Sequence, residues 1–100
     1  MAMVQIVYWR DIPAQVKVKE GRTRAAKQLT DRFQIAIDDA AMRAGLVGTD
    51  EYLAEWRSAE AQEREGEVEA VAALIAAELE AAYTDERLNG LAANKGRESK

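Results

Sequence analysis

The chain contains neither cysteine nor histidine among its 100 residues. Without cysteine it has no disulfide framework, no thiolate nucleophile and no thiolate metal ligand. Without histidine it also lacks the commonest general acid or base and the commonest ligand of transition metals. These absences exclude zinc sites, Ser-His-Asp triads and Cys-His dyads. Carboxylates remain as ligands for Mg²⁺ or Ca²⁺, but no calcium-loop spacing of acids occurs, so we expect no metal, no cofactor and no catalytic residues.

Long hydrophobic segments are also missing. The longest uninterrupted apolar run covers residues 70–77, whereas about 20 apolar residues are needed to span a bilayer. Residues 1–6 carry no basic segment followed by a long apolar one, which predicts that no signal peptide is present. We therefore expect a cytoplasmic protein that has no membrane partner.

Charge is distributed unevenly along the chain, whose formal net charge is −4. Residues 1–49 hold eight Lys or Arg and five Asp or Glu, a balance of +3. Residues 50–100 hold six Lys or Arg and thirteen Asp or Glu, a balance of −7. The difference in net charge between the two halves is larger than the net charge of the whole chain. We therefore expect charge to influence which partners the protein binds.

Two segments near the N-terminus have the patterning of β-strands. Residues 4–9 are mostly β-branched or aromatic, and residues 15–20 alternate polar and apolar side chains with a period of two. Pro13, the one proline in the chain, fixes its own φ and interrupts the first strand. We therefore predict an antiparallel pair joined by a turn at residues 11–14. Residues 22–28 are left open between an extended segment and a loop.

Helical periodicity begins at Thr30. An apolar stripe with a period of 3.6 residues predicts a helix that is capped by Thr30 and ends at Gly45. Thr49 is the expected cap of a short helix that follows. Residues 68–83 carry a second long apolar stripe, and Thr84 is expected to cap one further turn.

The segment between the short helix and the second long helix allows two interpretations. Residues 57–64 contain no strong apolar residue, so they either extend the short helix or form a polar edge strand. The strand is favoured because the following Glu65-Gly66 is typical of a turn. The spacing of the apolar residues predicts a shared core that includes Ile6, Phe33, Ile37, Val71, Ile75 and Leu79.

The segregation of strands and helices along the chain predicts an α+β fold. We expect a small antiparallel sheet of two to three strands, with two main helices packed on one face. One hundred residues are the usual length of one domain, which we assign to residues 1–91. Residues 92–100 are polar and are expected to form a disordered tail.

Part of this pattern resembles a known family. The distinctive part is the run Trp9-Arg10-Asp11-Ile12-Pro13-Ala14-Gln15-Val16, and the helical segments 32–41 and 50–53 add to it. With these residues, most of the chain (about residues 4–85) is similar to the small bacterial domain that carries the inherited name "virulence factor" domain. The resemblance implies a small bacterial cytoplasmic domain with no catalytic residues to carry over. It also associates stand-alone members with folate- and corrinoid-dependent one-carbon metabolism, which implies an accessory role in methyl transfer.

The turn after the first strand is the first candidate site. Trp9 offers a stacking face, Arg10 a grip for an anionic group, and Asp11 an acceptor that orients a donor. In the structural alternative, Trp9 belongs to the core and Asp11 bonds to nearby backbone. Trp and Arg are the residue types most enriched at interface hot spots, so the turn is a candidate contact surface for a partner. The residues that we assign to this surface are Trp9, Arg10, Asp11, Gln15, Arg22 and Arg24.

A run of basic residues across positions 17–32 is the second candidate. It consists of Lys17, Lys19, Arg22, Arg24, Lys27 and Arg32. The run suits a phosphate backbone, a small anionic ligand or an acidic partner, or else it is a solvated face that protects an edge strand from aggregation. Aromatic residues are not interleaved with it, and the acidic pI of about 4.9 argues against a nucleic-acid partner.

An interaction or accessory subunit of a larger enzyme fits these features best. An enzyme would have to work with Arg, Lys, Asp, Glu, Tyr and hydroxyl groups alone, and no motif supports one. The two alternatives are an accessory component of a folate- or corrinoid-dependent methyl-transfer system, and a module that binds a small ligand or nucleic acid through residues 17–32. We expect a larger protein as the partner, with self-association as a second option.

Overall fold

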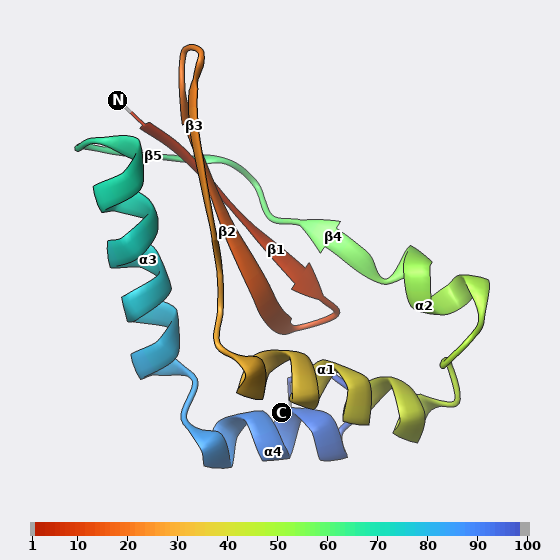
Figure 1. The fold of residues 1–100 in the computed structure, drawn as a ribbon. Helices are drawn as coiled ribbons and strands as arrows, with labels where there is room; N and C mark the ends of the chain where they lie inside the picture. Colours follow the sequence, from red (N-terminus) through yellow and green to blue (C-terminus); the bar gives the residue numbers. More distant parts are fainter. Residues whose placement is uncertain (1, 99–100) are drawn as a thin grey trace.

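A five-stranded antiparallel sheet and four helices make up residues 2–98, the part of the chain that the computed structural model describes (Figure 1). Along the chain the elements are β1 (Ala2–Trp9), β2 (Ile12–Glu20), β3 (Thr23–Gln28), α1 (Asp31–Ala44), α2 (Asp50–Ala54), β4 (Trp56–Ser58), β5 (Gln62–Arg64), α3 (Val68–Ala82) and α4 (Asp85–Ala93). The strand order is β3-β2-β1-β4, and β5 pairs with the other half of β1. The α+β class and the antiparallel sheet are therefore confirmed, but the sheet has more than the two to three strands expected.

The turn between β1 and β2 is shorter than predicted. It consists of Arg10 and Asp11, because Trp9 already pairs with Ile12 across the two strands. Pro13 lies inside β2, opposite Tyr8, where the register of the two strands shifts. Proline has no backbone N–H to donate to a neighbouring strand, so it is tolerated where the regular hydrogen bonding of the sheet is interrupted. The predicted turn at residues 11–14 is wrong for this reason.

Both segments that the sequence left open are strands. Thr23–Gln28 pairs with β2 along its whole length. Trp56–Ser58 and Gln62–Arg64 both pair with β1, and their registers differ by one residue. An extra residue in one strand of an antiparallel pair is a β-bulge, and here it divides one polar edge segment into two short strands. The strand interpretation of residues 57–64 is therefore confirmed.

The two faces of the sheet differ in character. In β2, Val16 and Val18 are buried whereas Lys17 and Lys19 are exposed. The helix α3 packs against β2 and β3 on the valine face. The period-two alternation of β2 thus separates an apolar face under α3 from a basic face that points the other way.

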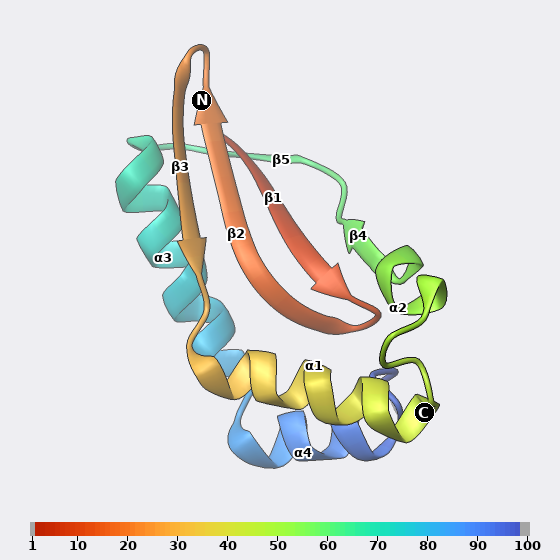
Figure 2. The ribbon, with the colours of Figure 1, turned by 45° about the vertical axis from the view of Figure 1, so that its right-hand side comes forward.

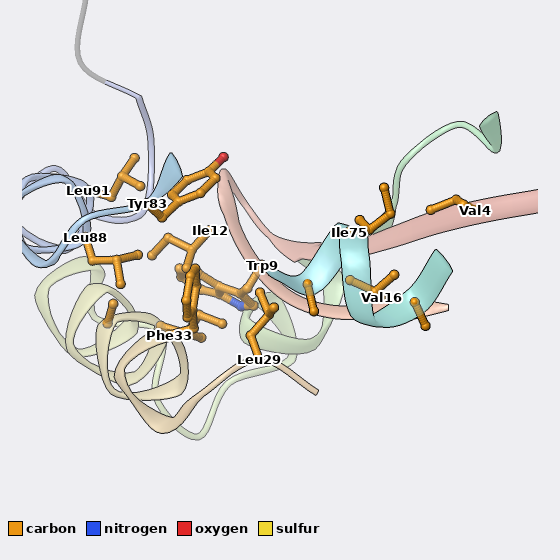
Figure 3. Close-up of a cluster of buried hydrophobic side chains, with 14 of the residues drawn as sticks. Val4, Trp9, Ile12, Val16, Leu29, Phe33, Ile75, Tyr83, Leu88 and Leu91 are labelled. Atoms are coloured by element: carbon orange, nitrogen blue, oxygen red, sulfur yellow. The ribbon is translucent and has the colours of Figure 1, made fainter. Parts of the chain in front are cut away.

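The remaining long helix, α1, packs against α4 across one end of the sheet (Figures 1 and 2). Between these helices and the end of β1 lies an apolar cluster that includes Trp9, Ile12, Phe33 and Leu88 (Figure 3). Of the six core residues predicted from the sequence, four are buried; Ile6 and Leu79 are partly buried and pack against the others.

Residues 92–98 differ from the expected disordered tail. The helix α4 continues to Ala93, and the chain beyond it lies against the β1–β2 turn, where Lys95, Gly96 and Glu98 make hydrogen bonds. This docking depends on residues that are far away in the sequence, so the polar composition of the tail did not predict it. Residue 1 of the expected domain and residues 99–100 of the expected tail lie outside the described part of the chain.

Candidate functional site

Trp9 is unavailable as a stacking platform for a ligand. Its side chain is fully buried, and its indole Nε1 donates a hydrogen bond of 2.9 Å to the carbonyl oxygen of Tyr52. The two rings also contact each other, with centroids 5.7 Å apart. Burial of a large aromatic side chain with its polar atom satisfied is typical of a core residue.

Arg10 binds, through its side chain, residues of the same chain that are distant in sequence. Its backbone is left-handed, with φ at 53°, a conformation that costs a non-glycine residue on the order of 1–3 kcal/mol. Its side chain is 11% exposed, and the guanidinium donates to the carbonyl oxygen of Lys95 at 2.8 Å and pairs with a carboxylate oxygen of Glu55 at 3.4 Å. These contacts offset the strain of the turn and give a partner to two of the three guanidinium nitrogens, while Nε has no partner within residues 2–98.

Asp11 is the second anchor of the turn. Its backbone N–H donates to the carbonyl oxygen of Gly96 at 2.8 Å, and its Oδ2 accepts from the backbone N–H of Glu98 at 2.7 Å. Its Oδ1 lies 3.5 Å from Nη2 of Arg57. Arg10 and Asp11 therefore bind the C-terminal segment of the same chain, which favours the structural interpretation of the turn.

The C-terminal segment that packs on the turn, residues 95–98, is also held by an ion pair between Glu98 and Arg87. Nη2 of Arg87 lies 2.6 Å from Oε1 of Glu98, and this hydrogen bond raises the pKa of Arg87. The guanidinium of Arg87 also lies over the ring of Tyr83, 4.0 Å from its centroid. Burial is the main cause that raises the pKa of Tyr83, so its hydroxyl stays protonated at neutral pH.

The six residues assigned to a binding surface do not come together. Trp9, Arg10 and Asp11 lie at one end of the β1–β2 hairpin, Gln15 lies within β2 opposite Val7, and Arg22 and Arg24 lie at the other end of β2 (Figure 2). Trp9 is opposite Ile12 and Arg24 is opposite Lys19, so at about 3.3 Å per residue these two groups lie more than about 20 Å apart along β2. The predicted surface is thus divided into a turn that contacts its own chain and a basic end of the sheet.

The basic run is divided as well. Lys17 and Lys19 lie on the exposed face of β2, and Arg24 is directly opposite Lys19 in β3. Lys27 is opposite Val16, so it belongs to the α3 side of the sheet. Three of the six cations therefore share the face of the sheet that α3 does not cover.

This open face is hollowed into a groove with a volume of about 710 Å³, which we call the basic groove. The residues that line it are Met3, Gln5, Lys17, Val18, Lys19, Arg24, Ala25, Ala26 and Ala61. They include three cations but neither a carboxylate nor an aromatic ring. The sequence located the cations, but the groove also needs Met3 and Gln5 of β1 and Ala61, which lies in the bulge beside β5.

The cations of the basic groove have no ion-pair partner among residues 2–98. Within the described residues, seven of the nine arginines pair with a carboxylate, and Arg22 and Arg24 are the two that do not. Lys19 and Arg24 face each other directly across two strands, and like charges in that position destabilise a sheet by up to about 1 kcal/mol. Met3 lies opposite Lys19 on the other side, and Glu63 lies opposite Met3. Glu63 is thus two strands from Lys19, a distance of about 10 Å.

Arg32, the last member of the basic run, has a structural role. Its guanidinium pairs with Glu80 at 3.0 Å and with Asp85 at 3.2 Å, and it donates to the backbone carbonyl oxygens of Glu80 and Tyr83. Thr30 is the N-cap residue of α1, but its hydroxyl donates to Glu80 instead of capping the helix. The pair of Arg32 and Glu80 thus joins α1 to α3 and leaves no free cation for a ligand.

The contacts between α1 and α3 lower the pKa of the Glu80 carboxyl group. Partial burial acts to raise its pKa, but hydrogen bonds from the backbone and hydroxyl of Thr30 and from Arg32 outweigh burial, and the pKa is lowered. A lowered pKa in the folded state stabilises the fold at pH values above the unfolded pKa, which is about 4.3. This stabilisation is lost as the pH falls through the folded pKa.

Replacement of Glu80 by glutamine tests this linkage. At pH 7 we expect Glu80→Gln to lower the free energy of unfolding by about 1–2 kcal/mol, since the charged hydrogen bonds are lost at a partly exposed site. The difference from the parent should shrink between pH 5 and the folded pKa, as measured by urea unfolding at a series of pH values. Glu78→Gln, an exposed position of the same helix, is the control. A difference that does not change with pH would contradict the electrostatic explanation.

Two kinds of feature are absent from residues 2–98: a cluster of metal ligands and a membrane-spanning helix. Among residues 2–98 there is no group of three acidic side chains close enough to hold a metal ion. Within the same range, no helix is both long and apolar enough to cross a membrane.

Comparison with known proteins gives one positive result. The family model described as "Virulence factor" matches residues 7–92, which include the β1–β2 turn, all three cations of the basic groove and the junction of α1 with α3. No curated protein and no solved structure matches the chain with statistical significance. Since the family model covers most of the chain, the protein belongs to the virulence factor family.

Proposed function

We propose that this chain is a non-catalytic accessory domain that binds an acidic segment of a larger protein in the basic groove. The observation that carries the proposal is the set of three cations, Lys17, Lys19 and Arg24, which share one open face without a carboxylate partner among the described residues. An arrangement that destabilises the sheet by itself becomes favourable when an anionic partner is bound. The turn at Arg10 is less suitable, because Nη1 and Nη2 of Arg10 and the carboxylate of Asp11 already bind the same chain.

An acidic protein segment fits the groove better than a nucleic acid does. Three cations allow at most about three phosphate contacts, each of which contributes to a salt-dependent affinity. The groove has no aromatic side chain on which a base can stack. In addition, residues 50–100 carry a net charge of −7, which repels a long polyanion more than a short acidic segment.

We also propose a candidate for the larger partner, on the basis of the one-carbon metabolism with which the family resemblance is associated. A larger enzyme of folate- or corrinoid-dependent methyl transfer would serve as the partner if it exposes an acidic segment. In that case the domain would supply a docking surface and the enzyme would supply all the chemistry.

Charge reversal in the groove tests the proposed function. We expect the double variant Lys17→Glu/Arg24→Glu to weaken binding of a short peptide of alternating glutamate and threonine by at least about tenfold, which corresponds to about 1.4 kcal/mol. The control is Lys27→Glu/Arg43→Glu, which changes the net charge equally but alters residues outside the groove. Binding is measured by fluorescence anisotropy at low and at physiological salt. Equal losses in both variants would contradict the proposal, and tighter binding of a single-stranded oligonucleotide at physiological salt would assign the groove to nucleic acid.

The stability of a single variant gives an independent readout. Arg24→Glu places a carboxylate directly opposite Lys19, so it converts a repulsive cross-strand pair into an attractive one. We expect the free energy of unfolding to rise by about 0.2–1 kcal/mol while peptide binding falls. A gain in stability with a loss of binding is typical of residues that are retained for function. A loss of stability in urea unfolding would show that Arg24 supports the fold.

A further inference from the structure

We propose that the acidic segment binds as an additional β-strand on the free edge of β3, with alternate carboxylates directed into the basic groove. This inference rests on the proposed function and adds to it the conformation and the location of the bound segment. An extended segment that joins a sheet edge gains affinity from main-chain hydrogen bonds and specificity from alternate side chains.

The first observation is that β3 ends the sheet. The strand order is β3-β2-β1-β4, so one side of β3 has no neighbouring strand. The backbone N–H of Leu29 donates to the carbonyl oxygen of Ala14, which fixes the phase of the ladder between β2 and β3. Because hydrogen bonding alternates along an antiparallel strand, the N–H and C=O groups of Arg24, Ala26 and Gln28 point away from β2. Within residues 2–98, no hydrogen bond outside the strand ladders satisfies them.

The second observation is that the free edge and the basic groove are continuous. Arg24 and Ala26 line the groove with their side chains and also carry outward-pointing backbone groups. A strand added to β3 would lie about 4.8 Å from it, so every second side chain would project over the same face as Arg24. A carboxylate opposite Arg24 would be within ion-pair distance, and Lys19, directly opposite Arg24 in β2, lines the same groove.

Protection of the edge against aggregation does not explain this charge pattern by itself. Charged residues on an edge strand deter unwanted pairing, which would account for Arg24 and Lys27. Lys17 and Lys19, however, lie in β2, which has neighbours on both sides. Their position beside the edge, on the groove face, is the feature that favours an acidic ligand there.

Charge also selects among the occupants of this edge. A second copy of β3 would bring a strand with two basic residues against another of the same kind, so self-pairing is disfavoured. The opposite side of the sheet is formed by two three-residue strands that a bulge separates, and its exposed residues include Glu63. An acidic segment is therefore expected at β3 and not at β4 or β5.

N-methylation of the peptide backbone tests the inference. Two versions of the glutamate–threonine peptide are N-methylated, one at every glutamate and the other at every threonine, so that each loses the N–H groups along one edge. A bound strand presents one edge to β3, so we expect one version to lose at least tenfold in affinity and the other to bind nearly as the parent peptide does. If the two methylated peptides bind equally well, the segment does not pair with the edge.

A variant of the protein gives the second test. Ala26→Pro removes an N–H that points to the free edge and bonds to nothing in β2, so the fold should be retained while strand addition is blocked. Loss of peptide binding with an unchanged far-UV circular dichroism spectrum supports the inference. If Ala26→Pro and both methylated peptides bind normally but Lys17→Glu/Arg24→Glu does not, the proposed function stands and strand addition is refuted. A concentration-dependent dimer in sedimentation, dissociated by Arg24→Glu, would assign the edge to a second copy and overturn the proposal.

Discussion

Truncation of the chain after Asn94 is expected to lower the free energy of unfolding by about 2–4 kcal/mol, because three hydrogen bonds worth roughly 1 kcal/mol each are lost. These bonds join Lys95, Gly96 and Glu98 to Arg10 and Asp11. For a domain of this size, each kcal/mol corresponds to about 4–8 °C in Tm. Thermal unfolding followed by circular dichroism measures the effect. An unchanged Tm would show that the docked segment contributes nothing to stability.

A pair of glycine variants isolates the contact between this segment and the core. Gly96 has φ at +86°, and a Cβ atom there would lie 2.8 Å from the buried ring of Trp9. Gly96→Ala is therefore expected to destabilise the protein by strain and by displacement of the segment. Gly90→Ala is the matched control, since Gly90 lies within α4 with open space around it, and alanine should stabilise the helix by about 0.5–1 kcal/mol. Opposite signs for the two variants are the expected result.

Truncation of a core side chain in α1 should have an effect of similar size. Ile37 is fully buried, so Ile37→Ala is expected to cost about 2–5 kcal/mol through lost burial and the cavity that remains. Leu79 in α3 is only partly buried, so Leu79→Ala should cost less, about 1–2 kcal/mol. Urea unfolding of both variants measures the difference. A larger loss for Leu79→Ala would contradict the burial that distinguishes the two sites.

The sequence alone determined the elements that depend on local interactions. Thr49 and Thr84 were expected to cap helices, and each accepts a hydrogen bond from a backbone N–H three residues later. Gly45 was expected to end α1, and it adopts the left-handed conformation that a terminating glycine requires. Caps and apolar periodicity involve residues within a few positions of one another, which is why they can be read without the fold.

Tertiary structure decided what depends on contacts between distant residues. The bulge between β4 and β5 exists because residues 56–64 must follow β1 from end to end, and no local pattern fixes that register. The same is true of the β1–β2 turn, whose polar groups bind residues 95–98 and also Glu55 and Arg57. The structural role that the sequence offered for Asp11 is therefore present, but its backbone partner is Glu98 and not a residue close by in the chain.

The basic run shows how the two levels combine. The sequence identified the cations from 17 to 32, but adjacency in the chain did not reveal which of them share a surface. Strand pairing placed Lys17, Lys19 and Arg24 on one open face, while helix packing directed Arg32 to Glu80. The physical reason is that side-chain direction follows from the pleat and the register of a sheet, and register is set by pairing across the whole fold.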